Sequence, residues 1–183
     1  MKLITQLSNF NIRNLHSKTL IMMLFAVLSM MFNDVYAQTP MHLSLPATGS
    51  SNAFPLSSTT SNRVQWLYLP SEITPTAMPG LITKIYLNTA GGGATSFTNL
   101  TVKMGTTTQA ASTTTFVGGM QTCYFAPTTT FPAHVSGDWV EINLQTPFFW
   151  NATENLVLEV SQEGYTVGRN MLQYTNNGNR RTY

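Results

Sequence analysis

Cysteine and charge are both scarce in this chain. Cys123 is the single cysteine, so no disulfide forms within the chain and stability must come from packing. We interpret Cys123 as a small buried residue of a strand, because no histidine close to it in sequence supplies a base. Charged residues are only 9% of the sequence, and after residue 37 only Arg180 and Arg181 adjoin each other. A basic stripe for phosphates is therefore missing, and we expect no nucleic-acid partner.

Motifs that carry catalysis are missing from the sequence as well. No serine lies in a G-x-S-x-G context, so His134 and Asp138 form an orienting pair without a nucleophile. Glu141 and Glu159 alternate with apolar residues, and we interpret both as solvent-facing surface charge rather than a glycosidase pair. The sequence therefore predicts no catalytic residue and a chain that is not an enzyme.

Cofactor and metal sites have no sequence signal either. The run of glycines at 91–93 lacks the lysine and helix of a phosphate-binding loop. Clustered cysteines and histidines for zinc and an acidic loop for calcium are also missing. We predict no cofactor-binding or metal-binding residue, while a calcium ion held by backbone carbonyls stays open because it needs no such motif.

The long apolar run of the chain lies close to its N-terminus. Thirteen apolar or small residues at 20–32 follow a segment that carries three basic residues and no acid. At about 1.5 Å per residue this run is too short for the roughly 30 Å core of a bilayer. Ala37 before Gln38 has the small side chain that signal peptidase requires. We predict a signal peptide at 1–37, cleaved between Ala37 and Gln38, export through the Sec pathway to the cell surface or medium, and no integral membrane segment afterwards.

What remains after residue 37 has the composition of strands and turns. Threonine supplies 26 of these 146 residues, and short alternating apolar runs are bounded by Gly, Pro, Asn and Ser. We predict an all-β domain, an antiparallel two-sheet β-sandwich with jelly-roll or Greek-key connections, preceded by the signal helix. Pro127 and Pro132 are expected to bracket a loop. The strands are predicted at 63–69, 81–87, 100–104, 120–125, 139–144, 156–160 and from 171 onward.

The final residues predict a hairpin. A strand at 171–174, a turn at 176–178 and a returning arm at 180–183 follow one another before the chain stops. We therefore divide the chain into the signal peptide (1–37), an extended segment with a first strand region (38–62) and a β-sandwich domain (63–183). We expect this domain to be incomplete at its C-terminus and to be followed by further domains of the same polypeptide.

Several segments, in their order along the chain, resemble a β-sandwich module of Bacteroidetes surface and secreted proteins. The resemblance covers nearly all of the chain after residue 37, and it implies the N-terminal module of a large multidomain protein exported by type IX secretion. Such modules accompany adhesins and peptidases alike, so it implies lineage and architecture rather than activity. The segments are GSSNAFP (49–55), RVQWLYLPSEI (63–73), LITKI (81–85), LTVKMGTT (100–107), GDWV (137–140), TPFFW (146–150) and NLVLEV (155–160).

The function predicted from these observations is binding or display. We expect a non-catalytic extracellular module with an adhesive or structural role; the alternative is a carbohydrate-binding module attached to a secreted hydrolase. The partner would be a glycan or a host or cell-surface protein. Trp66 alternates with Val64 and is expected in the core. Trp150, Tyr165 and Arg169 lie near turns, where alternation does not dictate burial, and are predicted to form the binding face.

Overall fold

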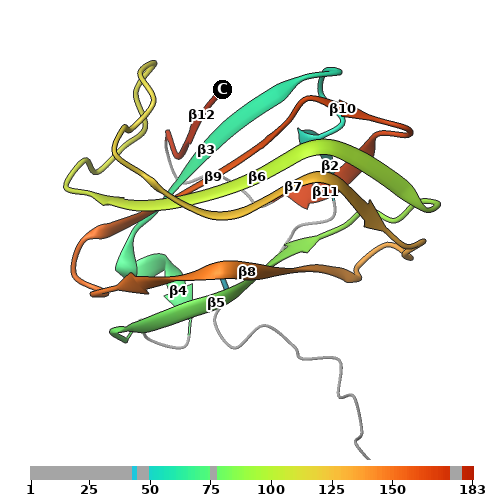
Figure 1. The fold of residues 1–183 in the computed structure, drawn as a ribbon. Helices are drawn as coiled ribbons and strands as arrows, with labels where there is room; N and C mark the ends of the chain where they lie inside the picture. The colour runs from blue at the N-terminus through green and yellow to red at the C-terminus, as the bar shows by residue number, and fades with distance from the viewer. Residues whose placement is uncertain (1–42, 45–49, 75–77, 174–178) are drawn as a thin grey trace, which may run out of the picture. The chain divides into compact units, whose positions relative to one another are not determined.

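The computed structural model describes residues 43–44, 50–74, 78–173 and 179–183 (Figure 1). The predicted signal peptide, with its cleavage site at Ala37 and Gln38, lies outside the described residues. Among the described residues, no helix is long and apolar enough to cross a membrane. The regular secondary structure of the described part is β strand, apart from the short 3-10 helix η1 at Pro70–Glu72.

The larger sheet has the strand order β7, β6, β9, β3 and β12, and the short strand β10 pairs with β6 just beyond the end of β9. All of its pairs are antiparallel. The bounds of these strands are β3 Asn62–Tyr68, β6 Thr95–Thr107, β7 Gln121–Phe131, β9 Asn155–Gln162, β10 Gly164–Tyr165 and β12 Arg181–Thr182.

A second layer is built from two antiparallel pairs, β5 with β8 and β2 with β11. An isolated bridge between Thr89 and Met171 joins these two pairs. A third, very short pair joins β1 to β4. The bounds are β1 Leu43–Ser44, β2 Ser50–Leu56, β4 Ile73–Thr74, β5 Gly80–Asn88, β8 Trp139–Trp150 and β11 Arg169–Gln173.

The strand pairs are nested along the chain and alternate between the two layers. The innermost pair is β6 with β7, followed outward by β5 with β8, β3 with β9 and β2 with β11. Figure 1 shows β5 and β8 side by side in one layer, and β3, β9, β6 and β7 in the other. A long hairpin wrapped in this way is a jelly roll. The prediction of an all-β, antiparallel, two-sheet sandwich is confirmed.

The core between the layers follows the period of two that the sequence shows. On β8, Val140, Ile142 and Leu144 are buried while Glu141 and Asn143 are exposed. Strand β6 supplies a second buried row that includes Val102 and Met104. Each such apolar side chain stabilises the fold by about 1.5–3 kcal/mol on full burial. Trp66, predicted to be in the core, is half-buried and packs against this cluster.

Two prolines, Pro127 and Pro147, lie inside strands. The predicted loop between Pro127 and Pro132 is wrong, because β7 runs through Pro127 and pairs with β6 on both sides of it. Asn99, which faces Pro127 in this register, takes a φ of 50°. Strand β8 likewise runs through Pro147 to Trp150. A proline removes only one donor from the ladder. At Pro147 the register shift between β5 and β8 accommodates this loss, whereas β7 keeps its register with β6 at Pro127.

The end of the chain does not form the predicted hairpin. Strand β11 pairs with β2, whereas β12 pairs with the edge of β3 in the other layer, where the Leu67 amide donates to the Arg180 carbonyl at 2.9 Å. The predicted turn at 176–178 lies outside the described residues. The turn residues indicate a local reversal, but long-range pairing decides which strands become neighbours.

Candidate binding surface

The structure does not bring the three predicted binding residues to one exposed face. Trp150 is 5% exposed in the core, and its indole Nε1–H donates to the Glu154 carbonyl at 2.9 Å. Tyr165 is half-buried, with its ring 6.3 Å from that of Phe97. Arg169 is 2% exposed and begins β11. Burial of Trp150 and Arg169 leaves neither side chain available to an external ligand.

Arg169 instead hydrogen-bonds to two loops, one at Gly93 and the other at Pro132. Its guanidinium donates to the carbonyl oxygens of Gly93 and of Pro132, the latter at 3.1 Å, and one of its nitrogens lies 3.2 Å from His134 Nδ1. Burial lowers the pKa of Arg169. The predicted orienting pair is engaged elsewhere: Asp138 accepts the Val135 amide at 2.9 Å, and His134 Nδ1 lies 2.8 Å from the Pro132 carbonyl oxygen.

Glu159 is not a surface residue, which corrects the interpretation from alternation. Its side chain is 1% exposed, and it accepts hydrogen bonds from Arg63 and from Gln65, each at 2.7 Å. Lys103 Nζ lies 3.3 Å from the other carboxylate oxygen, close enough for ionic attraction but without a hydrogen bond. Burial pushes the pKa of Glu159 upward. The hydrogen bonds from Arg63 and Gln65 and both positive charges outweigh this, so its pKa is below the ordinary value.

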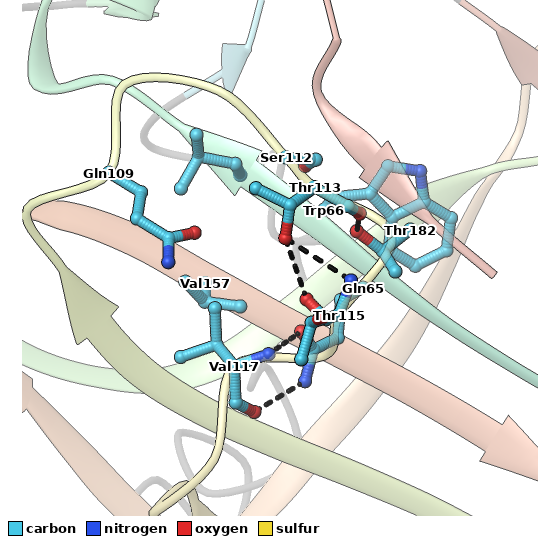
Figure 2. A pocket seen from close by; sticks show the side chains of 10 residues that line it. Gln65, Trp66, Gln109, Ser112, Thr113, Thr115, Val117, Val157 and Thr182 are labelled. Atoms are coloured by element: carbon cyan, nitrogen blue, oxygen red, sulfur yellow. Dashed lines mark hydrogen bonds between the residues drawn. The ribbon is translucent and has the colours of Figure 1, made fainter.

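Residues 108–120, the connection between β6 and β7, bury Glu159 by covering the outer face of the larger sheet. The Gln65 amide makes two hydrogen bonds to the Val117 backbone, at 2.8 and 2.9 Å, and the Thr182 hydroxyl donates to the Thr113 carbonyl at 2.7 Å. Figure 2 shows the two hydrogen bonds that join Gln65 to Val117 of this connection. The cavity between this connection and the sheet is about 10 Å³, roughly the room that one water molecule needs, so it does not accommodate an organic ligand.

The outer face of β5 and β8 is open, and it carries an ordered polar cluster. Lys84 Nζ lies 3.1 Å from Glu141 Oε1, and the Asn143 amide donates to the same oxygen at 2.7 Å. Tyr86 also hydrogen-bonds to Glu141. Burial raises the pKa of Glu141, but hydrogen bonds from Lys84, Tyr86 and Asn143 and the lysine charge outweigh it, so its pKa is lowered. Burial and the neighbouring carboxylate both raise the pKa of Tyr86.

An apolar pair lies next to this cluster on the same face. Leu81 and Phe149 are cross-strand neighbours, and they are 64% and 60% exposed. Leu81 is three residues from Lys84, a separation of about 10 Å along a strand. We call this surface, made of Leu81, Lys84, Tyr86, Glu141, Asn143 and Phe149, the β5–β8 strip.

A bulge in β8 separates the polar and apolar ends of the β5–β8 strip. Asn143 and Phe148 are five positions apart, but their partners Lys84 and Ile82 are two apart on β5. The extra residues include the exposed Pro147. Bulges re-aim neighbouring side chains, and here Phe149 still points outward in register with Leu81. A proline within a strand pattern is the sequence signal for this irregularity, and the sequence interpretation missed it.

The described residues contain no group of three or more His, Cys, Asp or Glu side chains placed to hold a metal ion. Comparison of the chain with protein-family models, with curated proteins and with solved structures finds no match. The resemblance to a Bacteroidetes module therefore stays a prediction.

Proposed function

We propose that this chain is a non-catalytic β-sandwich module of a secreted or cell-surface bacterial protein, with an adhesive or structural role. The β5–β8 strip carries this proposal, because it combines exposed apolar side chains with an ordered polar cluster on an open sheet face. Solitary exposed apolar residues are ordinary, whereas apolar residues next to preorganised polar groups mark binding surfaces. The partner is a glycan or a protein on a cell surface, and the module acts alongside further domains of its polypeptide.

The hydrogen bonds of the acidic residues support a structural role for these residues. All six carboxylates after residue 37 accept hydrogen bonds from neighbouring groups of the chain. Carboxylates that stabilise the fold are expected to be hydrogen-bonded in this way. Glu159 accepts a hydrogen bond from Gln65, which in turn bonds to the Val117 backbone of residues 108–120. Glu72 pairs with Arg180 of the C-terminal segment at 3.1 Å. The others are Asp138, Glu141, Glu154 and Glu163.

One observation favours the alternative, a carbohydrate-binding module attached to a secreted hydrolase. The Phe149 ring is exposed on the same face as hydrogen-bonding groups of Tyr86, Glu141 and Asn143. Sugars present an apolar face together with hydroxyl groups, so this combination suits them. In both versions the chain itself binds and does not catalyse.

The proposal is tested by measuring the binding of the fluorescently labelled chain, expressed from its full sequence, to intact bacterial and animal cells. We expect saturable binding that the unlabelled folded chain displaces and that heat-denatured chain does not. A panel of chromogenic ester, peptide and glycoside substrates should stay uncleaved. Absence of saturable binding, or turnover that disappears when one of the six carboxylates is replaced, would contradict the proposal.

A further inference from the structure

We propose that the β5–β8 strip binds an uncharged oligosaccharide, with one sugar ring stacked on Phe149 and a neighbouring sugar hydrogen-bonded at the Glu141 cluster. This inference rests on the proposed function and names its ligand class and its site. The site differs from the face predicted from sequence, since Trp150 and Arg169 are buried.

The charge of the strip selects an uncharged ligand. Lys84 and Glu141 neutralise each other at 3.1 Å, so the strip has no net charge. A charged polymer would lose hydration on binding, and no opposite charge on the strip would compensate for that free energy. The cluster nevertheless offers N–H donors from Lys84 and Asn143 beyond those given to Glu141. The Glu141 carboxylate is an acceptor, and so is the Tyr86 oxygen, whose one hydrogen is already donated to Glu141. A ligand that donates and accepts through the same group satisfies both kinds, and hydroxyl groups do this.

The side chains of the polar cluster are held in fixed positions, which favours binding. Glu141 holds Lys84, Tyr86 and Asn143 in place before any ligand arrives, so less side-chain freedom is lost on binding. At the other end, Leu81 and Phe149 form an exposed apolar pair that offers contact area to the apolar face of a sugar ring.

The spacing sets the length of the ligand. The apolar pair and the cluster are about 10 Å apart along β5, which is more than one sugar ring covers while contacting both. The strip is an open face and not an enclosed cavity, so a polysaccharide can continue past the site in both directions. The strip is therefore expected to bind an oligosaccharide and not a monosaccharide.

A second copy of the chain is a poorer occupant of the strip. A stable protein interface buries about 800 Å² on each partner, whereas the apolar part of the strip is a single pair of side chains, Leu81 and Phe149. Association would also remove the Lys84–Glu141 pair from water, and this desolvation offsets much of the gain.

Calorimetric titration of the chain, expressed from its full sequence, tests the inference. The probes are the uncharged hexaoses of β-1,4-glucan, β-1,4-xylan, β-1,4-mannan and α-1,4-glucan, with an acidic galacturonate oligomer for comparison. We expect at least one hexaose to bind, Phe149→Ala to weaken it about tenfold, and Phe149→Tyr to retain it, because the ring is what stacks. Asn143→Ala should weaken binding severalfold. Tyr183→Ala removes a ring that is 71% exposed elsewhere and should leave the affinity unchanged.

Three titration results would overturn the inference, with thermal melting confirming that each variant is folded. They are silence toward all four hexaoses, binding of the acidic oligomer alone, and hexaose binding unaffected by both Phe149→Ala and Asn143→Ala. A dimer that Phe149→Ala dissociates would assign the strip to a second copy instead.

The cell-binding assay separates this inference from the proposed function. Oxidation of the cell-surface sugars with periodate should abolish binding of the chain. Binding that survives periodate but not protease treatment would refute the glycan and leave the adhesive function standing, whereas no saturable binding would remove both.

Discussion

Replacing Glu159 with glutamine is expected to destabilise the fold by about 2 kcal/mol at pH 7. Hydrogen bonds to charged groups contribute about 1.5–3 kcal/mol each, and the carboxylate accepts two, from Arg63 and Gln65. Two effects reduce the loss: the glutamine oxygen still accepts one donor, and Arg63, whose side chain is 48% exposed, regains water. In a domain of this size the loss corresponds to a fall in Tm of roughly 5–10 °C.

Glu141→Gln is the matched control, because it removes the same charge from an exposed pair. Surface ion pairs contribute about 0–1 kcal/mol, so this variant should differ little from the unsubstituted chain. Urea unfolding followed by tryptophan fluorescence measures both free energies of unfolding. Equal losses for Glu159→Gln and Glu141→Gln would refute the reasoning that burial by residues 108–120 gives Glu159 its weight.

The pH dependence provides a second check on Glu159. Its folded pKa is lowered, mainly through Arg63 and Gln65 working against burial, so the unfolded chain takes up the proton first as pH falls. The stabilisation by this carboxylate is therefore fully present above its unfolded pKa of about 4.3 and is lost as pH falls through the lower folded value. The difference between the unsubstituted chain and Glu159→Gln should shrink in that range. A difference that stays constant down to pH 2 would contradict the assignment.

Two further predictions use neighbouring or internal controls. Gly91→Ala should lower the free energy of unfolding by about 2–3 kcal/mol, because Gly91 has a φ of 89° and a Cβ there would lie 2.8 Å from the Ser136 amide nitrogen. Gly93 has open space around it, so the control Gly93→Ala should change that free energy by less than about 1 kcal/mol. Equal losses for the two variants in urea unfolding would contradict the steric argument. The Cys123 thiol is buried and its pKa is raised by that burial, so Ellman's reagent at pH 8 should label it at least roughly a hundredfold more slowly in the native chain than in urea. Rapid native labelling would mean that β7 opens readily.

Strand β8 illustrates how much of the fold can be predicted from the sequence. The alternation of Val140, Ile142 and Leu144 with Glu141 and Asn143 predicts both the strand and its buried face, and both are observed. The length of the strand was not predictable in the same way, because Pro147 signals either an end or a bulge. Only the register against β5 distinguishes the two.

The candidate site shows the opposite balance. Alternation places Glu159 and Glu141 alike on outer faces, yet one is buried and the other is not. The difference arises from residues 108–120, which lie over one sheet and not the other, and no local pattern near either glutamate encodes it. Turn proximity equally failed to indicate that Trp150 and Arg169 are buried by strands and loops distant in sequence.

Side-chain period and turn residues act over a few neighbouring positions, so they are enough to predict the all-β class and most strand positions. Tertiary structure decided the nested pairing of the strands, the burial of Glu159 and the assembly of Leu81, Lys84, Tyr86, Glu141, Asn143 and Phe149 into one strip. These features depend on contacts between residues tens of positions apart, and such contacts form only when the whole chain packs.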